Sequence, residues 1–442
     1  YSYNWHKIVL LFLTAIFLCL LFYGFPDSPA PWFDEGVHLN VAKTIATQGI
    51  FSFTIDAGNY LNERYLITTG YPLLGVIALV FKIFGVGIYQ AKLVMFTFLS
   101  LFVLLFYRLA KKYYGEKNAL SSLALLIMFL PLYGNGKSVL GEIPGLVYFL
   151  GGLLLLDKKK WWQIFITGLL FGLGGATKPL YLLFVFAVIG GEVWLAIKDK
   201  KIDLKRWLWL GLGGALPLFL WIYTLLPHGF DTSSLLAILN FYRSPYTVPL
   251  EGTVIKNLWK FFSESTPLHF TLLFTVFVFS KAISKKFNQM EIVLFIFIVL
   301  VLASYLRIVG WYRYFFPAHI ILFILFPYAL SVIFNKIPGN LCKKYGVATV
   351  VVLLFLAQSA HLFLNINTRL YYDPQPRKFA AEVSKLVPGN TDILVVDNPV
   401  VAFFLKNDKI RQRLDIEPYL SVSDLSGVSS SSLPYYIIEE EE

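Results

Sequence analysis

The sequence predicts an all-α polytopic membrane protein with about eleven transmembrane helices and a small α/β domain near its C-terminal end. Hydrophobic residues make up 57% of the 442 residues, charged residues only 15%, and the mean hydropathy is +0.65. Soluble globular domains contain about 25% charged residues. The charges gather in short breaks between apolar runs of about 15 to 22 residues, a length typical of membrane-spanning helices. Helices are the expected spanning form because they satisfy their own backbone polar groups.

The apolar runs define the expected spans. We expect transmembrane helices over residues 7–25, 88–110, 119–134, 140–156, 161–177, 179–197, 207–226, 267–280, 289–306, 315–334 and 345–364. Lys7 precedes the first run and no small-residue cleavage site follows it, so we expect a retained anchor with a cytoplasmic N-terminus. An odd number of spans then places the C-terminus on the extracytoplasmic side.

The net charge of +11 comes largely from short loops between these spans. Basic loops at residues 111–117, 157–160, 198–201, 281–286 and 335–344 all fall on the expected inner side. This is the positive-inside pattern, and contact with anionic lipid explains the charge. We therefore expect the lipid bilayer, and no nucleic acid, as the partner of these residues.

Residues 70–85 are apolar but are not expected to cross the membrane. The segment is short and contains Pro72 and Lys82. If it crossed, every later basic loop would lie on the outer side, against the positive-inside rule. We predict an interfacial or re-entrant helix on the outer side.

Three segments are then expected outside: residues 26–87, residues 227–266 and the chain after about residue 365. We divide the chain into a membrane domain over 1–366 and a small α/β domain over 367–442. For the latter we expect an amphipathic helix at 376–387, a strand at 393–397, a short helix at 399–405, a flexible loop at 421–432 and a strand at 434–438.

The stretch PWFDEGVHLN at residues 31–40 places two acids, Asp34 and Glu35, directly after the first apolar run. An amphipathic helix over 34–48, with Asp34 as its N-cap and Gly49 after its end, is a purely structural explanation. The location favours a further role. His38 lies one helical turn after Asp34 on the same face. A carboxylate at the membrane surface could act as a general base or bind a divalent cation.

Three more charged residues are expected at the same surface. Glu142, in 138-SVLGEIPG, has a structural alternative as an acid in a helix's first turn. Lys178, in 174-GGATKPL, and Arg313, in 310-GWYRYFFP, could alternatively extend to lipid headgroups. Together the cations fit a phosphate, which Arg binds through two hydrogen bonds and Lys as a point charge.

This set of residues predicts sugar transfer from a lipid phosphate. A base would remove a proton from an acceptor hydroxyl as the hydroxyl attacks the anomeric carbon of the sugar. The cations would then take up the charge that develops on the departing phosphate.

These motifs, in this order, resemble the GT-C superfamily of polyprenyl-phosphate-sugar-dependent glycosyltransferases, especially the branch of protein O-mannosyltransferases and lipid A aminoarabinose transferases. The resemblance covers about residues 7 to 330. It rests on 33-FDEGVHLNVAKTIATQG, residues 70–85 and 92–115, 141-GEIPG, 168-GLLFGLGGATKP and 313-RYFFP. It implies an inverting glycosyltransferase that moves a single sugar from a polyprenyl-phosphate carrier to a lipid, glycan or protein acceptor on the extracytoplasmic face.

The resemblance also implies roles for individual residues. Asp34 would be the catalytic base, and Glu35 and Glu142 are further catalytic candidates. Lys178 and Arg313 would lie near the donor phosphate. Tyr314 and His38 complete the substrate-binding candidates around them.

The chain departs from its relatives before the segment 70–85. Many relatives carry a Lys-Pro-Pro stretch where this chain has 68-TTGYP, so Arg64, with Glu63 beside it, is a candidate to replace the missing charge. Some relatives bind a metal and others do not. We therefore keep both a divalent cation (Mg²⁺, Mn²⁺ or Zn²⁺) on Asp34, Glu142 and Glu63 and a metal-free site as alternatives.

Two other functions fit the composition. A transporter or flippase for lipid-linked sugars would also carry charges among its spans, although the chain lacks the internal repeats common in transporters. A non-catalytic membrane subunit of a polysaccharide assembly complex is the second alternative.

Overall fold

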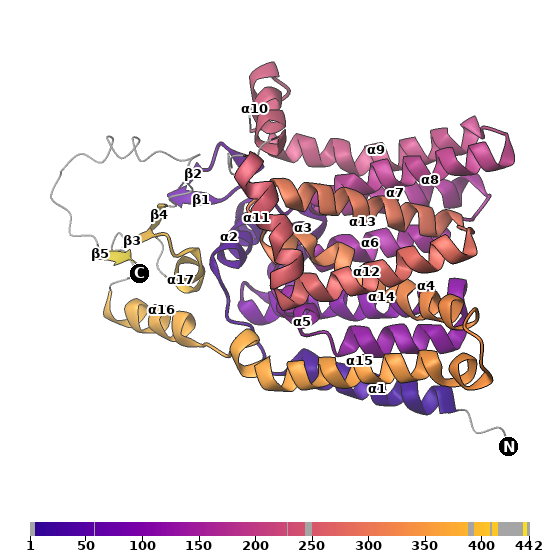
Figure 1. Ribbon diagram of the computed structural model, residues 1–442. Helices are drawn as coiled ribbons and strands as arrows, with labels where there is room; N and C mark the ends of the chain where they lie inside the picture. The colour runs from indigo at the N-terminus through magenta and orange to yellow at the C-terminus, as the bar shows by residue number, and fades with distance from the viewer. Residues whose placement is uncertain are drawn as a thin grey trace.

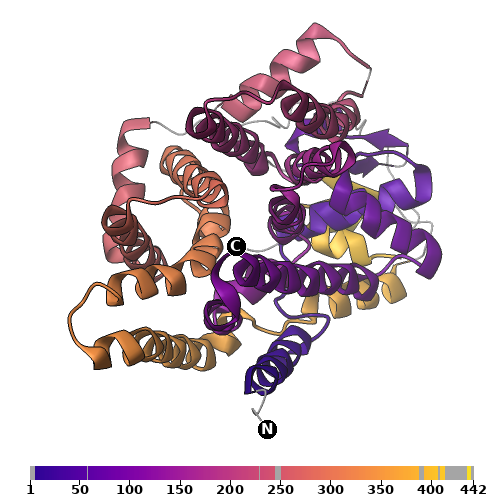
Figure 2. The ribbon, with the colours of Figure 1, turned by 90° about the vertical axis from the view of Figure 1, so that its right-hand side faces the viewer.

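The computed structural model describes residues 5–56, 58–227, 229–243, 250–387, 393–406, 409–413 and 436–439. It is a bundle of roughly parallel and antiparallel helices with a smaller α/β unit at one end (Figure 1). The long helices of the bundle are α1 (Trp5–Phe22), α4 (Ile88–Ile127), α6 (Glu142–Leu155), α7 (Trp161–Thr177), α8 (Leu183–Asp199), α9 (Leu204–Leu225), α12 (Ser265–Ser284), α13 (Gln289–Arg307), α14 (Tyr312–Phe334) and α15 (Asn340–Arg369). Figure 2 views these helices nearly along their axes.

The remaining elements lie mostly at one end, which we call the loop end of the bundle (Figure 1). They comprise α2 (Phe33–Gln48), β1 (Thr54–Asp56), β2 (Asn59–Tyr60), η1 (Arg64–Leu66), α3 (Tyr71–Phe84), α5 (Leu130–Lys137), η2 (Pro179–Leu182), α10 (Thr232–Arg243), α11 (Leu250–Ser263), α16 (Gln375–Leu386), β3 (Ile393–Val396), α17 (Pro399–Phe404), β4 (Ile410–Arg413) and β5 (Tyr436–Glu439). Helix α1 begins at the opposite end, which we call the far end.

Each predicted span falls on helical structure, and the protein is a multi-pass membrane protein. Among the described residues, eight helices are long and apolar enough to cross a bilayer, and the pair α5–α6, bent by 103°, would make nine. The predicted span 88–110 and the first part of the span 119–134 are joined in α4, which continues through the expected loop and is broken at Gly115 (φ 78°). Glycine adopts this left-handed conformation without a steric penalty. The rest of the second span continues into α5. The count of eleven stays a prediction.

The segment predicted to lie at the interface forms helix α3, with Pro72 in its first turn. Its 14 residues extend about 21 Å at 1.5 Å per residue. This length is well short of the roughly 30 Å hydrocarbon core of a bilayer. The helix packs on α2 and α4, and presents Leu79, Ile83 and Phe84 outward.

Two features make the bundle a rigid frame for the loop end. Helix α14 is central: every residue from Phe315 to Leu330 except Tyr328 is buried. Helices α7 and α9 approach closely through glycines, since a Cβ atom on Gly168 would lie 2.2 Å from the Leu210 carbonyl oxygen. The glycine-rich sequence of α7 allows this close approach.

The chain after α15 forms a three-stranded parallel sheet in the order β4-β3-β5, with α16 and α17. The expected helices and the first strand form with boundaries within about two residues of those expected. Strand β5 covers part of the second expected strand, and β4 was not predicted. The expected loop 421–432 lies outside the described residues.

This C-terminal unit is fastened to the segment that carries the acidic motif. Asn40 Nδ2 donates hydrogen bonds to the carbonyl oxygens of Gly36 and Pro399, each at 2.8 Å. A Cβ atom on Gly36 would lie 2.5 Å from the Val400 backbone nitrogen, so only glycine allows α17 to pack this closely on α2. The Arg377 guanidinium also binds the buried Asp27 carboxylate at 2.6 Å.

Candidate active site

Asp34 is held by Arg313, which lies 279 positions later in the chain. The structure corrects the expected N-cap: Trp32 occupies that position, and Asp34 lies in the first turn of α2. Its carboxylate therefore does not cap the helix and instead accepts a hydrogen bond from Arg313 Nη1. The Asp34 side chain stays 28% exposed, whereas that of Arg313 is 11% exposed. The Asp34 carboxylate is therefore ion-paired and still accessible to solvent.

Aromatic rings surround the Arg313 guanidinium. Its central carbon lies 4.8 Å from the ring centroids of Trp32 and Trp311 and 5.0 Å from that of Tyr314. Arg313 Nη2 also donates to the Tyr314 hydroxyl at 3.1 Å. These contacts fix the plane of the guanidinium and leave Arg313 Nε buried without a hydrogen-bond partner.

A second ion pair lies beside Tyr314. Lys178, at the end of α7, contacts Glu142 Oε1 at 2.5 Å, and both side chains are almost completely buried. Glu142 Oε2 has no hydrogen-bond partner. Lys178 Nζ lies 5.7 Å from the Tyr314 ring centroid. Tyr314 therefore contacts both cations.

Glu35 does not reach this group. Its carboxylate is fully buried and pairs with the equally buried Lys92 of α4 at 2.6 Å. It also accepts the Val139 backbone N–H at 3.0 Å. Burial raises the pKa of Glu35, although the Lys92 charge opposes this rise. The burial and the pairing with Lys92 favour a structural role for Glu35, and its catalytic role stays a prediction.

His38 joins α2 to the same loop. Its Nδ1 lies 2.7 Å from the Val139 carbonyl oxygen. Burial lowers the pKa of His38 to about 4, although nearby Asp34 acts in the opposite direction. The ring is therefore neutral at neutral pH and donates its Nδ1 proton to Val139. His38 and Glu35 both bind Val139 and so fix the chain just before Glu142. His38 is only 2% exposed, and this geometry favours a structural role over a direct contact with substrate.

Arg64 and Glu63 lie at the 3₁₀ helix η1, and no described ion pair joins either of them to Asp34 or Glu142. The following turn does reach the site. Gly70 N–H donates to the Thr177 carbonyl at 2.9 Å, next to Lys178. Arg64 is half-buried, and its Nε has no hydrogen-bond partner.

Metal binding by Asp34, Glu142 and Glu63 stays a prediction. Within the described parts of the chain, no group of three or more His, Cys, Asp or Glu side chains is arranged to hold a metal ion. Asp34 and Glu142 are instead paired with Arg313 and Lys178. Carboxylates neutralised in this way are poorly suited to gather around a cation.

Lys178 and Tyr314 line a pocket of about 280 Å³ between η2, α10, α13 and α14. Thr68, Tyr242 and Ser304 add polar groups to its wall. The rest of the wall is apolar, and includes Leu180, Leu183, Phe241 and Ile308. A pocket with a lysine in an otherwise largely apolar wall suits an anion attached to an apolar chain.

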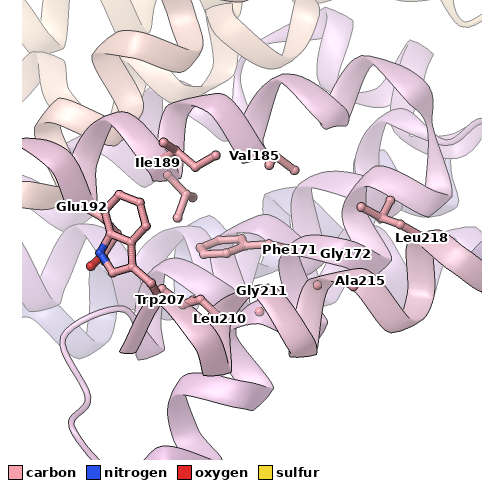
Figure 3. A pocket seen from close by; sticks show the side chains of 13 residues that line it. Phe171, Gly172, Val185, Ile189, Glu192, Trp207, Leu210, Gly211, Ala215 and Leu218 are labelled. Atoms are coloured by element: carbon pink, nitrogen blue, oxygen red, sulfur yellow. The ribbon is translucent and has the colours of Figure 1, made fainter. Parts of the chain in front are cut away.

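A second pocket, of about 380 Å³, lies between α7, α8 and α9 (Figure 3). Its wall is apolar except near Glu192, where Arg206 and Gln289 already bind the carboxylate. It shares no lining residue with the Lys178 pocket, and its acid is already paired.

Sequence reasoning missed Lys92, Trp32 and Trp311. Lys92 is a lone charge near the start of an apolar run, and that isolation was a usable signal for a buried partner. The two tryptophans flank the acidic and Arg313 motifs directly in the sequence. Their stacking on Arg313 required the three-dimensional structure.

Comparisons with known proteins agree with this fold. Residues 73–223 match the family model described as dolichyl-phosphate-mannose-protein mannosyltransferase. The structure is similar to ArnT from Cupriavidus metallidurans in the apo state, with a TM-score of 0.62, 14% identity, and coverage of 91% of this chain and 85% of ArnT. The structure of ArnT bound to undecaprenyl phosphate matches equally well, with a TM-score of 0.62 and 14% identity over 94% of this chain and 86% of ArnT.

An oligosaccharyltransferase from Archaeoglobus fulgidus, solved with Zn and sulfate, also matches, with a TM-score of 0.61 and 14% identity. The match covers 92% of this chain but only 62% of that enzyme. Comparison with curated protein sequences gives no significant match. We conclude that this chain is a multi-pass membrane protein whose fold is similar to that of ArnT, and that residues 73–223 resemble the mannosyltransferase family.

Proposed function

We propose that the protein is an inverting glycosyltransferase that moves a single sugar from a polyprenyl-phosphate carrier to an acceptor at the extracytoplasmic surface. One observation carries the proposal. A partly exposed carboxylate, Asp34, lies in contact with Arg313, while Lys178 lies against the same Tyr314 ring that Arg313 contacts. These contacts support a site in which Asp34 acts as the base and the two cations bind a phosphate, beside a pocket with apolar walls.

The ion pairs suggest how the site receives its donor. Without substrate, Arg313 neutralises Asp34 and Lys178 neutralises Glu142. The donor phosphate carries one negative charge, and both cations can share it. Transfer of Arg313 from Asp34 to the phosphate would release the carboxylate as a base only when a donor is bound.

The proposed reaction is a single displacement. The acceptor hydroxyl attacks the anomeric carbon from the side opposite the phosphate, and its proton passes to Asp34. The bond between the anomeric carbon and the phosphate oxygen breaks at the same time. The configuration therefore inverts, and the lipid leaves as a phosphate monoester with one additional negative charge. Arg313 and Lys178 stabilise that charge as it develops.

The form of the pocket supports a lipid-linked donor. Leu180, Leu183, Phe241 and Ile308 would contact the first part of the polyprenyl chain, and Lys178 would contact the phosphate. One similar structure is of ArnT bound to undecaprenyl phosphate, and another is of an archaeal oligosaccharyltransferase with an inhibitory peptide and dolichol-phosphate. These ligands belong to those proteins, and for this chain they support the class of carrier.

Charge distribution supports an extracytoplasmic site. The connections α6–α7, α8–α9, α12–α13 and α14–α15 lie at the far end and contain most of the basic loop residues. By the positive-inside rule, the far end faces the cytoplasm and the loop end faces outward. The chain before Lys7 would then be cytoplasmic, and the C-terminal unit would lie outside with the site.

Two of the sequence candidates take supporting roles in this proposal. Glu35 holds α2 to α4 and to the Val139 backbone, and does not contact the donor. Glu142 orients Lys178, and its unpartnered Oε2 can accept a hydrogen bond from a sugar or acceptor hydroxyl. The reaction as written uses no metal-bound step.

The proposal is tested in proteoliposomes that contain a radiolabelled polyprenyl-phosphate sugar and candidate acceptors. Purified protein should release polyprenyl phosphate and a glycosylated acceptor. Asp34→Asn should keep the fold and lower transfer by about 10² to 10⁴-fold, the usual contribution of a general base. Glu382→Gln, an exposed acid on α16, is the matched control and should retain full transfer. Full activity of Asp34→Asn, or movement of intact donor across the bilayer without transfer, would contradict the proposal.

A further inference from the structure

Helix α11 lies across the ends of the spanning helices instead of running parallel to them (Figure 1). It carries two different faces. Ile255, Leu258, Trp259 and Phe262 form an exposed apolar stripe at the spacing of one helical face. Trp259 is 67% exposed, whereas Asn257, between these residues in sequence, is 1% exposed.

The buried face of α11 binds the end of α13 and the turn that follows it. Asn257 Nδ2 donates to the carbonyl oxygens of Ile308 at 2.7 Å and Tyr305 at 3.1 Å. Lys260 Nζ donates to the Gly310 carbonyl oxygen at 2.9 Å. The last carbonyl groups of a helix have no partner within the helix, so α11 supplies donors that this end of α13 needs.

The turn bound by α11 leads directly into the candidate site. Gly310 has a φ of 71°, and a Cβ atom there would lie 2.0 Å from Asn257 Oδ1. The chain then enters α14, where Arg313 contacts Asp34 and Tyr314 contacts Lys178. A shift of the turn would therefore move both Arg313 and Tyr314.

The exposed stripe of α11 is continuous with the surface that faces lipid. Helix α12 begins two residues after α11 ends and presents Leu268 and Leu272 outward. The charged Glu251 and Lys256 lie exposed on α11 itself. An apolar stripe with a tryptophan, flanked by charges and lying across the ends of membrane spans, is typical of a helix at the boundary between headgroups and acyl chains.

We propose that α11 rests on the membrane surface at the loop end through Ile255, Leu258, Trp259 and Phe262, and from there holds the turn before Arg313 through Asn257 and Lys260. Asn257 is then a positioning residue for Arg313 and Tyr314. The membrane contact is independent of the proposed function. The effect of Asn257 on donor binding, in contrast, rests on the proposed function.

The membrane contact is tested with full-length protein in vesicles of phosphatidylcholine and phosphatidylglycerol. In a background with Cys19 and Cys342 replaced by serine, Trp259→Cys and Lys256→Cys are each labelled with an environment-sensitive fluorophore. The label at 259 should emit at shorter wavelength and be quenched by nitroxide-labelled lipids, and the label at 256 should not. Equal aqueous spectra and equal weak quenching at both positions would overturn the membrane contact.

The positioning role is tested through binding of polyprenyl phosphate. Asn257→Asp keeps the shape of the side chain but removes its two N–H donors and adds a charge beside carbonyl oxygens. It should weaken binding by about tenfold or more, the equivalent of one or two lost hydrogen bonds. Lys260→Met is a milder second variant with a smaller expected loss, and Lys256→Met on the exposed flank is its matched control.

The outcomes separate the two proposals. If Arg313→Ala weakens binding but Asn257→Asp and Lys260→Met do not, the positioning role is wrong and the proposed function stands. If Arg313→Ala also leaves binding unchanged, the proposed donor site itself is wrong. A variant of Asn257 that lowers thermal stability while donor affinity stays normal would show a purely structural role and also overturn the proposal.

Discussion

Asp34 and Glu35 are neighbours in the sequence but have opposite environments. Glu35 points into the protein, where it pairs with Lys92 and is sealed from solvent. Asp34 pairs with Arg313 and keeps part of its surface exposed. Successive residues on a helix differ in direction by about 100°, so a single acidic pair can serve two purposes. Glu35 holds α2 in place, and Asp34 remains accessible to solvent and to a bound ligand.

The sharpest test of the buried pair is Lys92→Met. It leaves the Glu35 carboxylate buried without its cation, and such a change costs about 3 to 5 kcal/mol of stability. The thermal unfolding temperature in detergent should fall strongly. The double variant Lys92→Met/Glu35→Met should recover most of the loss, because both charges are then gone. Exposed Lys82→Met is the control, and equal unfolding temperatures for Lys92→Met and wild type would refute the structural role of the pair.

His38 tests the buried side of α2 through pH. Its folded pKa of about 4 lies below the unfolded value near 6.5 because of burial. The folded state therefore binds fewer protons, so its stability contribution is complete above pH 6.5 and is lost as the pH falls toward 4. Each pH unit in this range removes up to about 1.4 kcal/mol. His38→Asn retains an N–H that can reach Val139, and its unfolding temperature should depend less on pH. An identical pH dependence in both proteins would contradict this assignment.

Arg313→Ala tests the exposed side. Loss of the guanidinium should lower affinity for polyprenyl phosphate by roughly 1.5 to 3 kcal/mol, the contribution of a charge-assisted hydrogen bond. Stability should change less than in Lys92→Met, because Asp34 can be solvated when it loses its partner. Arg313→Lys should restore only part of the affinity, since an ammonium group cannot form the two parallel hydrogen bonds. Isothermal titration with the carrier lipid measures these differences. If Arg313→Ala destabilised the protein as much as Lys92→Met does, the proposed difference between the environments of Asp34 and Glu35 would be wrong.

The smallest expected effect concerns the rings around Arg313. Trp32→Leu removes one aromatic face that lies 4.8 Å from the guanidinium. A partly exposed contact of this kind contributes about 0.5 to 1 kcal/mol. Donor affinity should fall by a few-fold, with transfer at saturating donor unchanged. Trp162→Leu, at the far end, serves as the control, and equal donor affinities for the two variants would argue against a role for Trp32.

The sequence allowed prediction of the features that depend on long patterns or on strong local chemistry. The apolar runs predicted the helices, and Gly49 was expected to end α2, where it indeed adopts φ 74°. Asp34 and Arg313, which were predicted to share one surface, are in contact, as are Glu142 and Lys178.

The remaining features depend on contacts between distant parts of the chain. Glu35 and Lys92 pair only because the fold brings the start of α2 near the start of α4, and neither residue type alone indicates burial. Helices α10 and α11 are amphipathic and short, so their orientation across the bundle depends on tertiary contacts such as those of Asn257. Strand β4, with the sequence IRQR, lacks an apolar pattern and forms by pairing with β3.

The most direct test of the central claim is an experimental structure of the protein with polyprenyl phosphate in a lipid nanodisc. We predict that the phosphate lies against Arg313 and Lys178, with the polyprenyl chain along Leu180, Leu183 and Ile308, and with Asp34 released from Arg313. A phosphate bound elsewhere, for example at the pocket between α7, α8 and α9, with the Asp34–Arg313 pair intact, would contradict the account.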